Sequence, residues 1–150
     1  MSHSNFQRTA VWLQACGKVP APGPLSVQIG CDLEEIAEYL ACLSLDSNAD
    51  QDELNLTSHQ LHQLGNALKK GLIQARIRDE DRADALDAIC DREVTANGVC
   101  YLAGFDKEAA DEAVLTSNEA KLVDGKPVIL PGGKIGKPEG WRAPNLSGFV

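Results

Sequence analysis

Apolar residues recur at helical spacing in several segments of this chain. The clearest stripe consists of Leu33, Ile36, Leu40 and Leu43. Residues three and four apart lie on one face of an α-helix, so this stripe predicts a helix with one side turned towards a core. Aromatic residues make up only 5% of the sequence, whereas Ala and Leu are frequent, which favours helices over sheets. The pattern predicts an all-α fold.

Helix-breaking and helix-capping residues divide the chain into its predicted segments. Three prolines between residues 19 and 24 predict an extended connector. Thr57 and Asp106 are suitable N-caps, and Gly71 and Gly104 are suitable stops. We expect helices over residues 4–17, 26–45, 57–70, 79–103 and 106–120.

Apolar positions within these helices predict what the core contains. In the segment 79–103 we expect Leu86, Ile89, Cys90 and Val94 to form the core face. On the first helix we expect Phe6 to pack into the core. These assignments follow from periodicity alone and concern which side chains share a face.

The length of the chain and the distribution of glycine, proline and apolar residues along it predict one domain over residues 1–150. A chain of 150 residues suits one domain with a real core. We place that core at about residues 4–120. Residues 121–150 contain six glycines and four prolines with little periodicity, so they predict an irregular C-terminal tail.

Charge and cysteine content bear on partners and compartment. The formal net charge is −8, and an acidic protein does not bind a nucleic acid polymer by charge alone. The five cysteines are odd in number and form no CxxC pair, which indicates a reducing compartment. No apolar run of about 18 residues is present, so we expect no membrane span and a cytoplasmic location.

Two acidic clusters are the most informative candidates for a functional site. Carboxylates three and four apart share a helix face, and crowded carboxylates repel unless water surrounds them or cations neutralise them. Oxygen ligands of this kind suit Mg²⁺, with Mn²⁺ as an alternative ion, facing the phosphates of a substrate. The clusters are Glu34, Glu35 and Glu38 in the first case and Asp84, Asp87 and Asp91 in the second.

The alternative interpretation is a pair of solvated helix faces. Such faces usually carry basic residues three or four positions away. No basic residue lies within four positions of Glu34–Glu38, and Arg82 and Arg92 flank only the ends of the second cluster. The sequence therefore favours the metal site over a plain acidic surface.

Other motifs carry weaker signals. His59 and His62 form an HxxH pair that fits a solvated helix face better than a metal site, since no further ligand is spaced nearby. Trp12 could stack on a base or pack into the core, and the sequence leaves both interpretations open. Gly132-Gly133-Lys134 lacks the following Ser or Thr of a phosphate loop. Basic tail residues could reach phosphates or merely solubilise the tail; they are Lys121, Lys126, Lys134, Lys137 and Arg142.

An ordered set of motifs resembles the MazG-like all-α nucleoside triphosphate pyrophosphohydrolases. The resemblance covers about residues 25–45 and 80–147, and is nearest to the branch with phosphoribosyl-ATP pyrophosphatase-like proteins and phage nucleotide hydrolases. Its motifs are Glu34–Glu38 (EExxE), Asp87–Asp91, Ser117–Lys121 (SNxxK), Asp124–Pro127 (DGKP), Gly133–Pro138 (GKxxKP) and Trp141–Leu146.

The resemblance implies a four-helix-bundle type of fold, assembled as a homodimer or homotetramer with sites between helices and often between subunits. It implies Mg²⁺-dependent cleavage of a (d)NTP to (d)NMP and pyrophosphate, with purines such as dGTP or dATP favoured. Glu34, Glu35 and Glu38 would be catalytic, and Glu34 would bind metal or orient the water. The metal would be held by Glu35, Glu38, Asp87 and Asp91, and the phosphates by Asn118, Lys121 and Lys134.

The second acidic motif departs from the family pattern. The usual ExxD would place Glu at Ala88 if Asp91 is its last residue, whereas Asp84 and Asp87 keep the spacing with Asp in place of Glu. Asp91 is the stronger candidate and Asp84 the weaker. This departure leaves open a non-catalytic helical oligomer that binds nucleotide or a partner protein. Hydrolysis of phosphoribosyl-ATP, in which the bond broken is of the same type, is a second enzymatic alternative.

Overall fold

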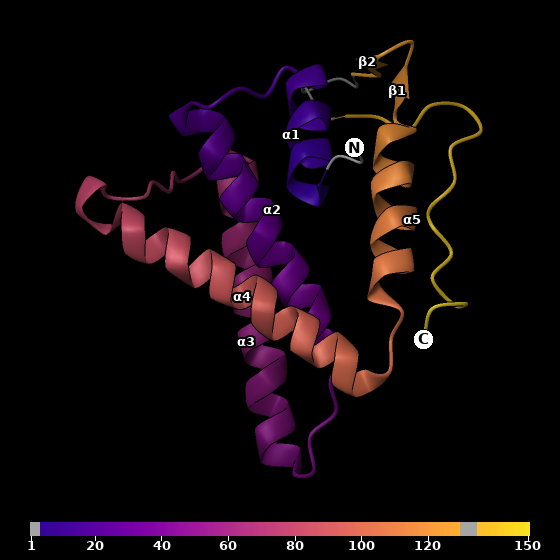
Figure 1. Cartoon of the computed structure of the whole chain (residues 1–150). Coiled ribbons are helices and arrows are strands. Elements are labelled where there is room, and N and C mark those ends of the chain that lie inside the picture. Colours follow the sequence, from indigo (N-terminus) through magenta and orange to yellow (C-terminus); the bar gives the residue numbers. More distant parts are fainter. Residues whose placement is uncertain (1–3, 130–134) are drawn as a thin grey trace. The chain divides into compact units, whose positions relative to one another are not determined.

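The computed structural model describes residues 4–129 and 135–150, and these form mostly helices (Figure 1). The all-α prediction is confirmed at this level, while the four-helix-bundle arrangement stays a prediction. The elements are α1 (Asn5–Ala15), α2 (Pro22–Ala41), α3 (Asn48–Lys69), a short 3₁₀ turn (Asp79–Asp81), α4 (Arg82–Ala103), α5 (Lys107–Glu119), β1 (Leu122–Val123) and β2 (Lys126–Pro127).

The chain divides into two compact units. Pro20–Asp79 forms one unit, and Met1–Val19 combines with Glu80–Val150 to form the other. The hairpin unit, as we call Pro20–Asp79, contains α2 and α3. The tail unit contains α1, α4, α5 and the C-terminal segment. That residues 1–150 act as a single domain stays a prediction.

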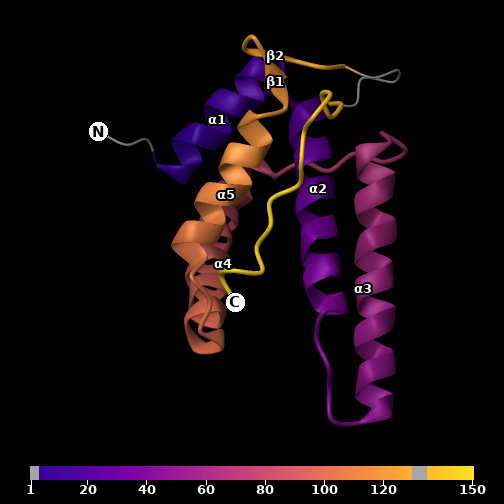
Figure 2. The ribbon, with the colours of Figure 1, turned by 90° about the vertical axis from the view of Figure 1, so that its right-hand side faces the viewer.

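In the hairpin unit, α2 and α3 lie side by side (Figure 2). Their contact is made through small residues: Ser26, Gly30 and Ala37 of α2 are buried, as is Gly65 of α3. A Cβ atom on Gly30 would lie 2.8 Å from the Gly65 carbonyl oxygen. The two backbones therefore approach each other as closely as glycine allows.

Both helices of this unit begin earlier than we expected. α2 begins at Pro22, because proline is tolerated in a first turn, where backbone N–H groups lack helical partners anyway. α3 begins at Asn48, and the Ser47 hydroxyl caps it by accepting from the Asp50 N–H. Thr57 is therefore not a cap; its hydroxyl donates to the Glu53 carbonyl at 2.9 Å inside the helix. The predicted end before Gly71 is confirmed.

The apolar stripe of α2 is half-buried rather than buried. Leu33, Ile36, Leu40 and Leu43 all keep intermediate exposure, whereas Gly30 and Ala37 make the closest contact. Small residues let two helices approach closely, and the larger side chains then lie at the flanks of the contact. The periodicity predicted the helix but not which face would meet its neighbour.

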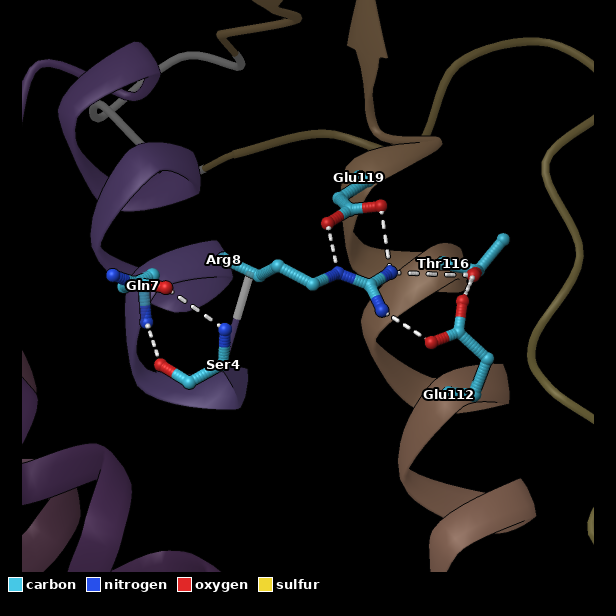
Figure 3. Close-up of polar contacts among 6 residues, drawn as sticks. All are labelled: Ser4, Gln7, Arg8, Glu112, Thr116 and Glu119. Atoms are coloured by element: carbon cyan, nitrogen blue, oxygen red, sulfur yellow. Dashed lines mark hydrogen bonds and ion pairs between the residues drawn. The ribbon is translucent and has the colours of Figure 1, made fainter. Parts of the chain in front are cut away.

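In the tail unit, α1 packs against α5. α1 starts with a capping box, in which the Ser4 hydroxyl accepts from the Gln7 N–H and the Gln7 side chain accepts from the Ser4 N–H (Figure 3). α4 ends at Gly104 with φ of 78°, and the Asp106 carboxylate caps α5. These two boundaries confirm the predicted ones.

Several residues expected in the core are exposed. Leu86, Ile89 and Val94 of α4 are 63%, 53% and 68% exposed, and Cys90 is exposed as well. Phe6 is 81% exposed, so its expected core packing is wrong. Helical spacing predicts which side chains share a face, but it does not predict what covers that face.

The tail begins with a tight hairpin and then returns along α5 (Figure 1). Asp124 and Gly125 both have positive φ, as a two-residue turn of this kind requires. The Trp141 indole N–H donates to the Ser117 carbonyl at 2.8 Å, and the Asp106 N–H donates to the Phe149 carbonyl at 2.9 Å. Hydrogen bonds thus attach an irregular tail to a regular helix. No helix in the described part of the chain is long and apolar enough to span a bilayer.

Candidate functional site

The three glutamates of the first acidic cluster lie on α2 at the edge of its contact with α3. Glu34 is half-buried, with 22% of its side chain exposed, while Glu35 and Glu38 are exposed. Glu34 follows Gly30 by four residues, so it lies just beside the small-residue contact. The cluster therefore runs from the interhelical groove out to solvent.

Glu34 has basic partners on the neighbouring helix. The Lys69 ammonium group forms an ion pair with one carboxylate oxygen, and the His62 Nε2 lies 3.5 Å from the other. The side-chain amide of Asn66 hydrogen-bonds the His62 Nδ1 at 3.2 Å. No basic residue lies near this cluster in the sequence, yet Glu34 has basic partners in the fold, because they come from α3 rather than from α2 itself.

Negative charge remains in excess at the exposed end of the cluster. Partial burial, followed by the charges of Glu38 and Glu34, raises the pKa of Glu35, and Lys69 opposes this rise only in part. A carboxylate held among like charges favours any cation that approaches it. Glu35 and Glu38 thus offer oxygen ligands of the kind that hard divalent cations take.

A complete metal shell is not formed within the described residues. Across residues 4–129 and 135–150, no group of three or more His, Cys, Asp or Glu side chains is arranged to hold a metal ion. Mg²⁺ usually keeps several waters and binds through one or two carboxylates plus substrate phosphates. The exposed pair Glu35 and Glu38 fits such a partial shell.

The second acidic cluster lies on α4 in the other unit. Asp84, Asp87 and Asp91 are all exposed, and their spacing places them on one side of the helix. The structure thus confirms the helix that carries them. That they complete a metal site with the glutamates, and in which register, stays a prediction.

Three of the predicted nucleotide-binding residues come together in the tail unit. The Lys121 ammonium group donates to the Asn118 side-chain oxygen at 2.8 Å and lies 6.0 Å from the centroid of the Trp12 ring. Trp12 belongs to α1, and Asn118 and Lys121 lie at the end of α5 and just beyond it. Lys134, the fourth predicted residue, lies outside the described residues.

A cavity of about 210 Å³ borders this group. Its lining is largely apolar, and the indole N–H of Trp12 is buried with no hydrogen-bond partner among the described residues. Apolar walls with a few polar groups are typical of ligand sites. The lining residues are Arg8, Val11, Trp12, Glu119 and Leu122.

Arg8 holds α1 against α5 beside this cavity (Figure 3). Its guanidinium donates to both oxygens of Glu119 at 2.8 and 2.9 Å and also pairs with Glu112. This contact lowers the pKa of both glutamates. Sequence reasoning missed Arg8, because its partners lie more than 100 residues further along the chain.

No known family model, curated protein or solved structure matches this chain. The resemblance to the MazG-like enzymes therefore rests on the sequence motifs alone and stays a prediction.

Proposed function

We propose that the protein is a Mg²⁺-dependent nucleoside triphosphate pyrophosphohydrolase that cleaves a (d)NTP to (d)NMP and pyrophosphate. The observation that carries the proposal is the EExxE cluster on α2, where partial burial and then the neighbouring like charges raise the pKa of Glu35, while Lys69 pairs with Glu34. The cluster thus combines one carboxylate that is held by an ion pair with two that are exposed. The exposed carboxylates can serve as ligands of a divalent cation, and the held one can orient a water molecule.

The glutamates take different roles in this proposal. Glu35 and Glu38 would be ligands of the ion, and Asp87 and Asp91 of α4 are the further ligands that the motifs predict. Glu34, oriented by Lys69 and by His62, positions the attacking water. When bound, Mg²⁺ would neutralise phosphate charge. General base catalysis requires that the carboxylate is held within hydrogen-bond reach of the water it activates.

The tail unit supplies the contacts to the nucleotide. Asn118 and Lys121 contact the phosphates, together with Lys134. Trp12 stacks on the base in this proposal, which is supported by its place in the cavity lining and by the nearby Lys121 ammonium group. Stacking on an aromatic ring tolerates any base, so a purine preference belongs to the resemblance rather than to the cavity.

Exposed apolar side chains support an oligomer as part of the proposal. Leu86, Ile89 and Val94 of α4 leave more than half of their surface open. Exposed apolar side chains, where they join into a contiguous patch, commonly mark a protein–protein contact. We propose a homodimer or homotetramer, which light scattering coupled to size-exclusion chromatography would measure directly.

The proposal is tested by offering each (d)NTP with Mg²⁺ and identifying the products. We expect (d)NMP and pyrophosphate, and we expect no release of inorganic phosphate. Phosphoribosyl-ATP, tested beside the (d)NTPs, decides between the two enzymatic alternatives, since the bond broken is of the same type. If no triphosphate is cleaved although a nucleotide binds, the non-catalytic alternative is correct.

A further inference from the structure

Two side chains of α3 approach the two carboxylate oxygens of Glu34 separately. The Lys69 ammonium group forms an ion pair with one oxygen, and the Nε2 atom of His62 lies 3.5 Å from the other. An ionised carboxylate has about four lone-pair sites, so each oxygen keeps a position at which it can accept from a water molecule. Glu34 is therefore oriented from two sides and still able to bind water.

A contact on the far side of the His62 ring bears on which ring nitrogen carries the proton. The side-chain nitrogen of Asn66 lies 3.2 Å from the Nδ1 atom of His62. An amide nitrogen is a donor and not an acceptor, so Nδ1 accepts, and the proton of the neutral ring is then on Nε2. Nε2 is the nitrogen that faces Glu34. The neutral ring in this tautomer therefore turns an N–H group towards the carboxylate.

The charge of Glu34 favours the same tautomer of His62. In the other neutral tautomer, Nε2 would turn a lone pair towards a carboxylate oxygen, and both of these atoms are acceptors. The carboxylate on one side of the ring and the Asn66 amide on the other thus favour the same position of the proton. The hydrogen bond made by one ring nitrogen generally sets the state of the other nitrogen.

The second histidine of α3 shows that the length of the amide side chain matters. Gln63 follows His59 by four residues, as Asn66 follows His62. The Gln63 side-chain nitrogen lies 2.9 Å from the Nε2 atom of His59, whereas the shorter Asn66 side chain contacts Nδ1 of its histidine. One additional methylene thus moves the contact to the other ring nitrogen. Asparagine at position 66 leaves Nε2 of His62 available for Glu34.

We propose that Asn66 is a positioning residue, which holds His62 in the Nε2–H tautomer so that His62 and Lys69 together orient Glu34 towards the attacking water. The inference deepens the proposed function and rests on the role that it gives to Glu34. Asn66 acts through the imidazole ring and contacts neither the nucleotide nor the ion. Outer residues of this kind commonly fix the tautomer and orientation of a histidine in an active site.

The ¹⁵N chemical shifts of the imidazole nitrogens report the tautomer directly, without metal, nucleotide or turnover. The experiment uses the ¹⁵N-labelled full-length protein at about pH 8.5, well above the ordinary histidine pKa. His62→Gln identifies the His62 signals among those of the three histidines. We expect the proton on Nε2 in the wild type and a mixture of tautomers in Asn66→Ala. Asn66→Asp, whose carboxylate only accepts, should place a proton on Nδ1.

Gln63→Ala is the matched control. It removes a side-chain amide from the same helix, at the same spacing from the other histidine, and should leave the tautomer of His62 unchanged. If the wild-type His62 ring carries its proton on Nδ1, the inference is overturned. It is also overturned if Asn66→Ala leaves the tautomer as it is in the wild type, because Glu34 alone would then be sufficient to fix the ring.

Kinetics separates failure of this inference from failure of the proposed function. Asn66→Ala should lower kcat for nucleotide hydrolysis by about tenfold with little change in KM, because the water rather than the nucleotide is misplaced, and Gln63→Ala should change neither constant. If nucleotides are hydrolysed and Asn66→Ala keeps the wild-type kcat, the inference is wrong while the function stands. If no nucleotide is hydrolysed but the tautomer depends on Asn66, the function is wrong while the contact between Asn66 and His62 stands.

Discussion

The close contact between α2 and α3 makes a quantitative prediction for Gly30→Ala. A Cβ at this position would lie 2.8 Å from the Gly65 carbonyl oxygen and 2.9 Å from the Leu68 Cβ. Neither atom is the flexible end of a side chain, so the helices must move apart. Overpacking of this kind costs about 1–3 kcal/mol, whereas the higher helix propensity of Ala returns at most about 1 kcal/mol. We expect the free energy of unfolding to fall by about 1–2 kcal/mol.

The assay is urea unfolding followed by far-ultraviolet circular dichroism. Gly23→Ala is the control in the same helix, because a Cβ there meets nothing within 4 Å. It should leave stability unchanged or raise it slightly. If Gly30→Ala is as stable as Gly23→Ala, the helices do not approach as closely as described. The groove that positions Glu34 against Lys69 would then need another explanation.

Two further predictions concern charge and pH. Arg8 lowers the pKa of its two glutamate partners, so their contribution to stability is present above the ordinary carboxylate pKa and is lost as the pH falls through the folded-state values. In Arg8→Met, the free energy of unfolding should therefore fall less steeply as the pH is lowered through this range. An unchanged pH dependence would contradict the assignment. The pKa of Glu35 is raised in the folded state, so its contribution is complete below the ordinary pKa and is lost as the pH rises through the folded-state value. In an NMR titration, Glu38→Gln should lower the pKa of Glu35, because a like charge is removed, and Lys69→Met should raise it, because a positive charge is removed. Shifts of the Glu35 pKa in the same direction in both variants would contradict this account of the cluster.

Helix existence and several helix ends could be predicted because their causes are local. Gly104 and Asp106 end one helix and cap the next by bonds within a few residues. The early start of α3 was missed because Ser47 and Thr57 are both acceptable caps, and only the surrounding structure decides between them. Local signals therefore predict that a boundary exists more reliably than they predict its position.

The site could be predicted only in part, because its partners come from distant positions. EExxE predicts three carboxylates on one side of a helix, but not that Lys69, 35 residues away, would pair with Glu34. Likewise, the tail lysines look alike in the sequence, and only the structure shows that Lys121 and Lys137 lie near the Trp141 ring. Contacts between distant segments depend on packing, which one-dimensional spacing does not encode.

The central claim is that the exposed glutamates of α2 support metal-dependent cleavage of a nucleoside triphosphate. The most direct measurement is pyrophosphate release from dGTP and dATP with Mg²⁺, comparing the wild type, Glu38→Gln and the control Glu53→Gln on the exposed surface of α3. We predict release by the wild type and by Glu53→Gln, with a loss of about 100-fold or more in Glu38→Gln. Equal rates in all three proteins, or no release by any of them across the (d)NTPs, would contradict the claim.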